Sequence, residues 1–140
     1  MSSKYLDDIL SLPVQTNMRR MSPTISPSDS VSLAVNEMVK NNIGAVIVVI
    51  DSKPVGIITE RDVLGKVVQP LKDMDQTLVK DVMSEPIILI EANRSIKEAL
   101  DLMHKHSIRR LAVTKDSALI GLITERRLLE RVLSDLLTPP

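Results

Sequence analysis

An ungapped internal repeat constrains the fold of this chain more than any other feature of its sequence. The block Val55–Arg61 recurs as Ile120–Arg126, 65 positions later, with the glycine and the Thr-Glu-Arg triplet in the same places. The same spacing aligns apolar residues outside the block, beginning with Val14 and Val79. Because the register holds over half of the 140 residues, the sequence indicates two copies of one structural unit.

The repeat divides the chain into four segments. We place the two copies at residues 13–69 and 78–140, the second copy including a C-terminal helix. An N-terminal helical segment is expected at 1–12 and a linker at 70–77. A single copy of about 60 residues buries too little surface to be stable alone, so we expect the two copies to pack face to face.

Both copies predict the same order of elements, which is strand, helix, strand, strand, helix. Apolar residues at helical spacing give the first helix one buried face, and β-branched residues followed by a polar turn indicate a hairpin. The predicted ranges in the first copy are 23–26, 31–39, 45–50, 55–58 and 63–68, with the turn at 51–54. Those in the second copy are 87–91, 96–103, 111–114 and 128–136, with the turn at 116–117. The fold class is therefore α+β, with two β-α-β-β-α repeats.

The composition argues against nucleic acid as a partner. Tyr5 is the single aromatic residue, whereas modules for single-stranded nucleic acid stack bases on aromatic side chains. The formal net charge is +0, without the basic excess of a nucleic-acid binder.

Several other classes are excluded by residues that the sequence lacks. Without cysteine there can be no disulfide, thiolate nucleophile or cysteine-ligated metal, and four glycines form neither G-x-G-x-x-G nor a P-loop. The longest apolar run, Ala45–Ile50, is far short of the roughly 20 residues of a membrane span. The N-terminus lacks the apolar segment of a signal peptide, so we expect a cytoplasmic protein without membrane contact.

The two histidines offer poor material for a metal site or for catalysis. His104 and His106 lie two positions apart and therefore do not share a helix face. His104 replaces Val39 of the first copy, which favours a partly buried structural histidine. A hydrolase or transferase needs a nucleophile with a base, or a metal, so we predict no metal and no enzymatic activity.

The repeated pattern resembles a tandem pair of CBS domains, the arrangement called a Bateman module. The resemblance covers nearly the whole chain and rests on the order and duplication of four features. These are a Met before each first strand (Met18, Met83), Ser-x-x-x-Ala at each first helix (Ser30, Ser95), the block 108–113, and Gly-x-x-Thr-x-x-Asp at 56–62. It implies two repeats related by a pseudo-twofold axis, with a cleft that offers two sites for an adenosine nucleotide.

Carried over residue by residue, the resemblance centres the first site on Thr59, Arg61 and Asp62. It implies that Asp62 accepts the ribose hydroxyls and that Thr59 holds phosphate. The chemistry fits, because a carboxylate can accept two hydroxyl donors and the start of a helix favours an anion. Arg61 would add charge-assisted contacts to phosphate. The rest of this site would be an apolar wall for adenine (Ile57, Ile87, Ile88, Ile108, Ala112) and a basic pair near the phosphates (Arg109, Arg110).

The second site departs from the family pattern at its central residue. Arg127 stands where the ribose-binding Asp is expected, and an arginine cannot accept a hydrogen bond. The residues of this site would be Thr124, Arg126 and Arg127. The residues facing them would be Ser22, Pro23, Ile43, Gly44, Ala45 and Ile47. We expect it to be weak, empty or used differently, and therefore one nucleotide per chain.

A structural interpretation of Thr59 and Asp62 is also open. A Thr followed three positions later by an acidic residue is the pattern of a helix capping box, and both roles can coexist. Spacing alone favours the cap, whereas the duplicated context favours a ribose contact.

These observations predict a regulatory sensor, not an enzyme. It would bind an adenosine nucleotide between the repeats, with AMP preferred over ADP or ATP. It would then act in trans on a separate partner protein. The alternatives are a dimerisation module without a ligand and a binder of S-adenosylmethionine. The resemblance implies a disk-shaped homodimer, and the last helix carries a wide apolar row that agrees with it (Leu128, Leu129, Val132, Leu133, Leu136, Leu137).

Overall fold

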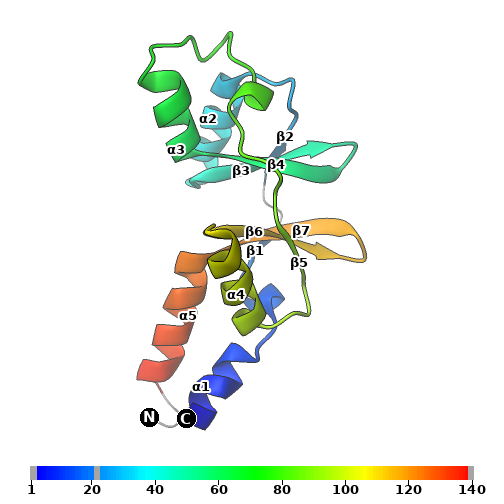
Figure 1. Ribbon diagram of the computed structural model, residues 1–140, viewed down its shortest axis with the longest axis vertical. Coiled ribbons are helices and arrows are strands. Elements are labelled where there is room, and N and C mark those ends of the chain that lie inside the picture. The colour runs from blue at the N-terminus through cyan, green and yellow to red at the C-terminus, as the bar shows by residue number, and fades with distance from the viewer. Residues whose placement is uncertain (1–2, 21–22, 139–140) are drawn as a thin grey trace. The chain divides into compact units, whose positions relative to one another are not determined.

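The described residues, 3–20 and 23–138 of a computed structural model, fall into two compact units. We call Ser22–Ile87 the central unit, and Met1–Met21 with Ile88–Pro140 the terminal unit. In each unit the helices lie on one face of a small mixed sheet (Figure 1). The α+β class and the two-repeat architecture are therefore confirmed.

The central unit is built around a three-stranded sheet in the order β2-β3-β4. Strand β2 (Thr24–Ile25) runs parallel to β3 (Ala45–Ile50), which forms an antiparallel hairpin with β4 (Lys53–Thr59). Its helical elements are α2 (Val31–Asn41), α3 (Glu60–Val63), η2 (Leu64–Val68) and η3 (Val79–Asp81). Helix α2 begins at Ser30, whose side chain accepts a hydrogen bond from the amide of Leu33, and it ends at a left-handed Asn42.

The terminal unit has a four-stranded sheet in the order β1-β7-β6-β5. The strands are β1 (Arg19–Arg20), β5 (Leu89–Glu91), β6 (Arg110–Lys115) and β7 (Ala118–Thr124). The helical elements are α1 (Ser3–Leu10), η1 (Val14–Asn17), α4 (Ile96–His106) and α5 (Glu125–Leu137). The Tyr5 hydroxyl donates to the carbonyl of Asp135 at 2.8 Å, which ties the first helix to the last.

Each unit is centred on one repeat but also includes the lead-in segment of the other repeat, by which we mean the residues just before that repeat's first strand. Val14 and Met18, which precede the first repeat's strands, lie in the apolar core of the terminal unit. Val79 and Val82, which precede the second repeat's strands, lie in the core of the central unit. The compact units therefore do not coincide with the sequence repeats 13–69 and 78–140.

The repeated glycines permit this exchange of lead-in segments. A Cβ atom on Gly121 would lie 2.6 Å from the carbonyl oxygen of Arg19, and one on Gly56 would lie 2.9 Å from that of Ser84. Contacts this short are prohibited for a side chain, so only glycine allows the lead-in backbone to approach β7 and β4.

Two sequence expectations need correction. The first hairpin turn is not residues 51–54, because Lys53 and Pro54 already belong to β4. The turn consists of Asp51 and Ser52, with φ angles of 50° and 67°, and two left-handed residues suit the twist of a hairpin. The closing helix of the first repeat is also not regular, since α3 continues as the π-helical η2.

No helix among the described residues combines the length and the apolar character that crossing a membrane requires.

Candidate functional site

Asp62 lies at the start of α3 and is only 8% exposed. The hydroxyl oxygen of Thr59 accepts a hydrogen bond from the amide of Asp62 at 3.2 Å, and Oδ2 of Asp62 accepts from the amide of Thr59 at 3.0 Å. The Thr59 hydroxyl also donates to Oδ2 at 3.0 Å. This reciprocal pair is a capping box, so the structural interpretation of Thr59 and Asp62 is confirmed.

Two further residues contact the same carboxylate. The hydroxyl of Ser84 donates to Oδ1 of Asp62 at 3.1 Å, and Nζ of Lys66 lies 3.3 Å from Oδ1. Lys66 also donates to the carbonyl of Val82 at 2.9 Å. Ser84 is held in place by paired backbone hydrogen bonds with Ile57, of 3.0 and 2.8 Å. We call Thr59, Asp62, Lys66 and Ser84 the Asp62 network.

The Asp62 network leaves the carboxylate fully engaged. A carboxylate offers about four acceptor sites, and here an amide, two hydroxyls and an ammonium group share them. A ribose hydroxyl could reach Asp62 only by displacing the Ser84 hydroxyl or the Lys66 ammonium. These are the removable partners, because Ser84 is exposed and the side chain of Lys66 is 49% exposed.

The remaining predicted residues are divided between the two units. In the central unit, Arg61 is exposed, Ile57, Ile87 and Pro23 are half-buried, and Ala45 is buried. In the terminal unit, Arg109, Arg126 and Arg127 are exposed, Ile88, Ile108, Arg110 and Thr124 are half-buried, and Ala112 is buried. Ser22 lies outside the described residues.

Within each unit, the sheet register brings together residues that we assigned to different sites. Ala45 on β3 lies opposite Thr59 on β4, and Arg110 on β6 lies opposite Thr124 on β7. Each predicted nucleotide site therefore draws on both units. The contact of Thr59 with Asp62 is in the structure, whereas the grouping across the units stays a prediction.

The equivalent place in the terminal unit has the opposite charge. Counting 65 positions, Arg127 replaces Asp62, Arg131 replaces Lys66 and Arg19 replaces Ser84. The hydroxyl of Thr124 still accepts from the amide of Arg127, at 3.1 Å, so the cap persists without a carboxylate. Arg131 pairs with Asp135 at 2.7 Å. The second repeat therefore keeps the capped helix start and lacks the carboxylate.

Sequence reasoning missed Lys66 and Ser84. Lys66 could have been found, because it lies four positions after Asp62 on the same helical path and can form an i, i+4 ion pair. Ser84 carried no comparable signal, since it reaches Asp62 only through the bridge of its segment to β4.

The expected position of His104 is wrong. Both His104 and its counterpart Val39 are exposed, Val39 by 76%, because this helix position faces solvent in both repeats. Within the described residues, no group of three or more His, Cys, Asp or Glu side chains could hold a metal ion.

An apolar groove of about 500 Å³ lies next to the Asp62 helix in the central unit. It is lined by residues of α2, the following loop and the first turns after Thr59 (Val35, Met38, Val39, Asn42, Ile43, Gly44, Glu60, Val63, Leu64). None of the four residues of the Asp62 network lines this groove, whereas Ile43 and Gly44, which we expected to face the second site, do.

Comparison with known sequences identifies both repeats. The family model of the CBS domain matches residues 7–69 and 79–134. An uncharacterized protein of Methanopyrus kandleri is 38% identical over 114 residues, which are 80% of this chain and 58% of that protein. The CBS domain-containing protein YhcV of Bacillus subtilis is 32% identical over 110 residues, 79% of this chain and 78% of YhcV. The chain thus spans little more than half of the first of these relatives.

Solved structures share the whole fold. A crystal structure of a CBS domain is 30% identical and covers 98% of both chains, with a TM-score of 0.73. The CBS domain of a bacterial CNNM/CorC family Mg²⁺ transporter, solved in complex with ATP, is 15% identical, with a TM-score of 0.80 over 94% of both chains, and shows the fold alone. With two matched repeats and a fold shared from end to end, the chain belongs to the CBS domain family and contains a tandem pair of such domains.

Proposed function

We propose that this CBS pair is a regulatory module that binds one adenosine nucleotide, AMP in first place, at Thr59, Arg61 and Asp62. The Asp62 network carries the proposal. It sets a nearly buried carboxylate at a helix start and holds it with two partners that are exposed and replaceable. Family membership supports a regulatory role, and the ATP complex of the CNNM/CorC neighbour supports the nucleotide class.

In the proposed binding step, the ribose hydroxyls replace Ser84 and Lys66 as donors to Asp62. The displaced Lys66 ammonium then becomes available to the phosphate, together with Arg61 and the hydroxyl of Thr59. The adenine would lie among the apolar residues Ile57, Ile87, Ile88, Ile108 and Ala112, with Arg109 and Arg110 near the phosphates. No catalytic step follows, because the role of the site is binding.

Binding at this site has a direct mechanical consequence. The hydrogen bond from Ser84 to Asp62 ties the lead-in segment of the second repeat to the start of α3. Replacing that hydrogen bond with a ribose hydroxyl releases the Ser84 side chain from the helix. We propose that this release is the signal transmitted to a partner protein.

Thermal unfolding with AMP, ADP, ATP and S-adenosylmethionine tests the proposal. A ligand that binds only the folded chain raises the Tm by mass action, by an amount that grows with ligand concentration. We expect the largest shift with AMP and a stoichiometry of one per chain by calorimetry. Asp62→Asn should lower the affinity for AMP at least tenfold. Arg127→Asn, the matched change in the second repeat, should leave that affinity unchanged. If none of the four ligands raises the Tm, nucleotide binding is refuted.

A second function, assembly as a homodimer, is favoured by one observation. Leu129, Leu133 and Leu137 recur every fourth residue on α5 and are 54%, 49% and 79% exposed. Such a stripe is large for a free helix surface. Sedimentation should give a species of twice 15.5 kDa, and Leu133→Glu should shift it towards the monomer. A monomer at micromolar concentration would contradict this assembly.

A further inference from the structure

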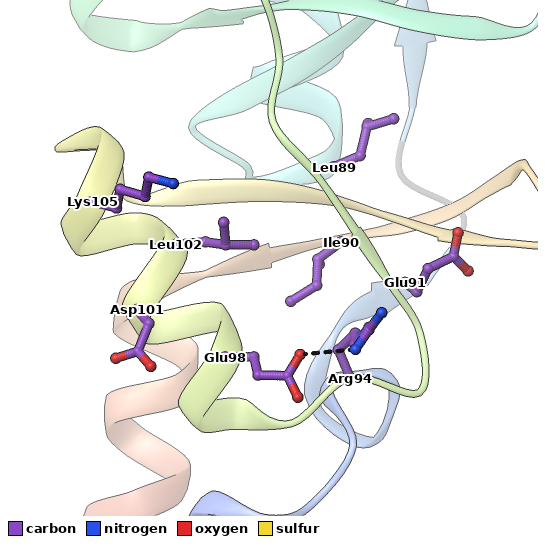
Figure 2. Close-up of a pocket in the computed structure, with 8 residues that line it drawn as sticks. All are labelled: Leu89, Ile90, Glu91, Arg94, Glu98, Asp101, Leu102 and Lys105. Atoms are coloured by element: carbon purple, nitrogen blue, oxygen red, sulfur yellow. Dashed lines mark ion pairs between the residues drawn. The ribbon is translucent and has the colours of Figure 1, made fainter.

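The terminal unit has a groove of about 470 Å³ between α4 and the strand β5 (Figure 2). Its apolar residues are Leu89 and Ile90 on the strand and Leu102 on the helix. Figure 2 shows Ile90 and Leu102 in the space between strand and helix, with the charged side chains around them. The charged residues of the groove are Glu91, Arg94, Glu98, Asp101 and Lys105. It contains none of the residues assigned to nucleotide binding.

One side of this groove is the open edge of a sheet. Strand β5 is the last strand in the order β1-β7-β6-β5, so among the described strands it pairs only with β6. The carbonyl of Ile88 accepts from Ala112 at 3.0 Å, and the amide of Ala92 donates to Thr114 at 2.8 Å. Because backbone groups alternate in a parallel ladder, those of Leu89 and Glu91 face away from β6.

The equivalent edge in the central unit is blocked by a side chain. Ser26, which directly follows β2, stands in the place of Glu91, and its amide donates to Oδ2 of Asp29 at 2.9 Å. Arg94 replaces Asp29 in the second repeat and cannot accept a hydrogen bond. Its guanidinium instead lies 3.5 Å from Glu98. The second repeat therefore lacks the carboxylate that covers the outward amide in the first.

The side chains beside the two edges also differ. Leu89 is 45% exposed, whereas the matching residue of β2 is the polar Thr24. Natural sheets protect their edges with polar residues, caps and short strands, because an open edge pairs with any suitable strand. An exposed leucine and an uncapped amide on the same edge are the features of a strand that accepts a partner.

The charge of the groove selects among extended peptides. Three carboxylates and two cations line it. Glu98 pairs with Arg94 and Asp101 pairs with Lys97, both exposed cations, and such surface ion pairs are easily exchanged. A basic side chain on an incoming strand can therefore take over either carboxylate.

We propose that this groove binds an extended peptide of a partner protein, which pairs with the outer edge of β5. The amide and carbonyl of Leu89 and the amide of Glu91 form the new ladder. Because side chains alternate between the two faces of a sheet, a branched aliphatic residue opposite Leu89 packs on Leu89, on the face away from α4. The next residue, a lysine or arginine, points to the α4 face, where it lies over Ile90 and Leu102 and faces Glu98 and Asp101. This is addition of a strand to a sheet edge, with backbone hydrogen bonds for affinity and the groove for specificity.

The peptide acetyl-Lys-Val-Lys-Val-Lys-amide tests the proposal on the full chain. NMR spectra of ¹⁵N-labelled protein should show shifts at Leu89 and Glu91, and hydrogen exchange of these two amides should slow at least tenfold near saturation. The amides of Thr24 and Ser26 on the matched edge should not change. A peptide with glutamate in place of lysine should bind at least tenfold more weakly. Absence of shifts at β5 at millimolar peptide, or equal shifts on β2, would overturn the proposal.

A pair of proline variants isolates the backbone contribution. Leu89→Pro removes an outward amide and spares the ladder to β6, and proline is tolerated at such an edge position. It should lower the affinity for the lysine peptide at least tenfold. Thr24→Pro, the matched change on β2, should leave the affinity for this peptide unchanged. If Leu89→Pro lowers the Tm, Asp101→Lys replaces it, with an expected loss of at least threefold. Unchanged affinity in the folded variant would exclude strand addition.

Discussion

The starts of α3 and α5 are the same structure with opposite chemistry. Thr59 and Thr124 both cap their helices through the amide three residues later, at 3.2 and 3.1 Å. Only the first start has a carboxylate at that third position, and it is surrounded by Ser84 and Lys66. The second has arginines in all three places. The comparison separates what both helix starts share, which is the threonine cap, from what the proposed nucleotide site requires, which is the acid.

The largest expected loss of stability comes from replacing Gly121 or Gly56, the glycines that let the lead-in segments approach β7 and β4 closely. Gly121→Ala should destabilise the chain by about 1–3 kcal/mol, because the new Cβ meets backbone and cannot be accommodated by a rotamer change. Gly56→Ala should cost less, since its closest contact is 2.9 Å instead of 2.6 Å. Urea unfolding of both variants measures the difference. Equal stability of both variants and the wild type would show that the lead-in segments move freely.

The two threonine caps should differ in how much they contribute to stability. Thr124→Ala should lower the free energy of unfolding by about 1 kcal/mol, the usual cost of losing a cap. Thr59→Ala should cost more, because its hydroxyl also donates to Asp62. Urea unfolding is again the measurement. A smaller loss at Thr59 than at Thr124 would mean that Ser84 and Lys66 compensate for the missing hydroxyl.

Arg127→Asp should make the second helix start more like the first. An acidic residue in the first turn of a helix is favourable, so we expect a gain of about 0.3–1 kcal/mol. The measurement is the Tm at low and high salt, and the gain should shrink as salt rises. A loss of stability would indicate that Arg127 has a structural role that its exposed position does not suggest.

Lys66→Met should have the smallest effect on stability, below about 1 kcal/mol, because the Lys66 side chain is half exposed and Asp62 keeps an amide and two hydroxyl donors. Its effect on ligands is more informative. Under the proposed binding step, adenosine should bind more tightly, since one donor no longer competes for Asp62. AMP should gain less or lose affinity, because Lys66 no longer meets the phosphate. Calorimetry with both ligands checks the sign, and identical changes for adenosine and AMP would remove Lys66 from the phosphate site.

The local elements of this fold could be predicted because the repeat tests every assignment twice. The strand predicted at 45–50 has those bounds in the structure, and the capping box was recognised from Thr59 and Asp62 alone. The Asp62 network was only half predicted. Its threonine and aspartate are three residues apart, whereas Ser84 lies 22 residues away and reaches the carboxylate through a backbone bridge to Ile57. Spacing within one element reveals the first kind of contact and not the second.

The prediction that His104 is partly buried was wrong for a related reason. An apolar counterpart, Val39, suggested a buried position, but Val39 is itself exposed. A helix face is set by its neighbours in the fold, and a single pair of matched residues does not define it.

The exchange of lead-in segments has a consequence for how the chain is made. The central unit is one continuous stretch, Ser22–Ile87, whereas the terminal unit needs both Met1–Met21 and Ile88–Pro140. During synthesis from the N-terminus, the central core can close as soon as Val82 has emerged. Val14 and Met18 must wait, without their packing partners, until Leu128 has been made. A cut in the segment between the repeats would not yield two halves that fold, because it would take from each core the residues that the other half supplies.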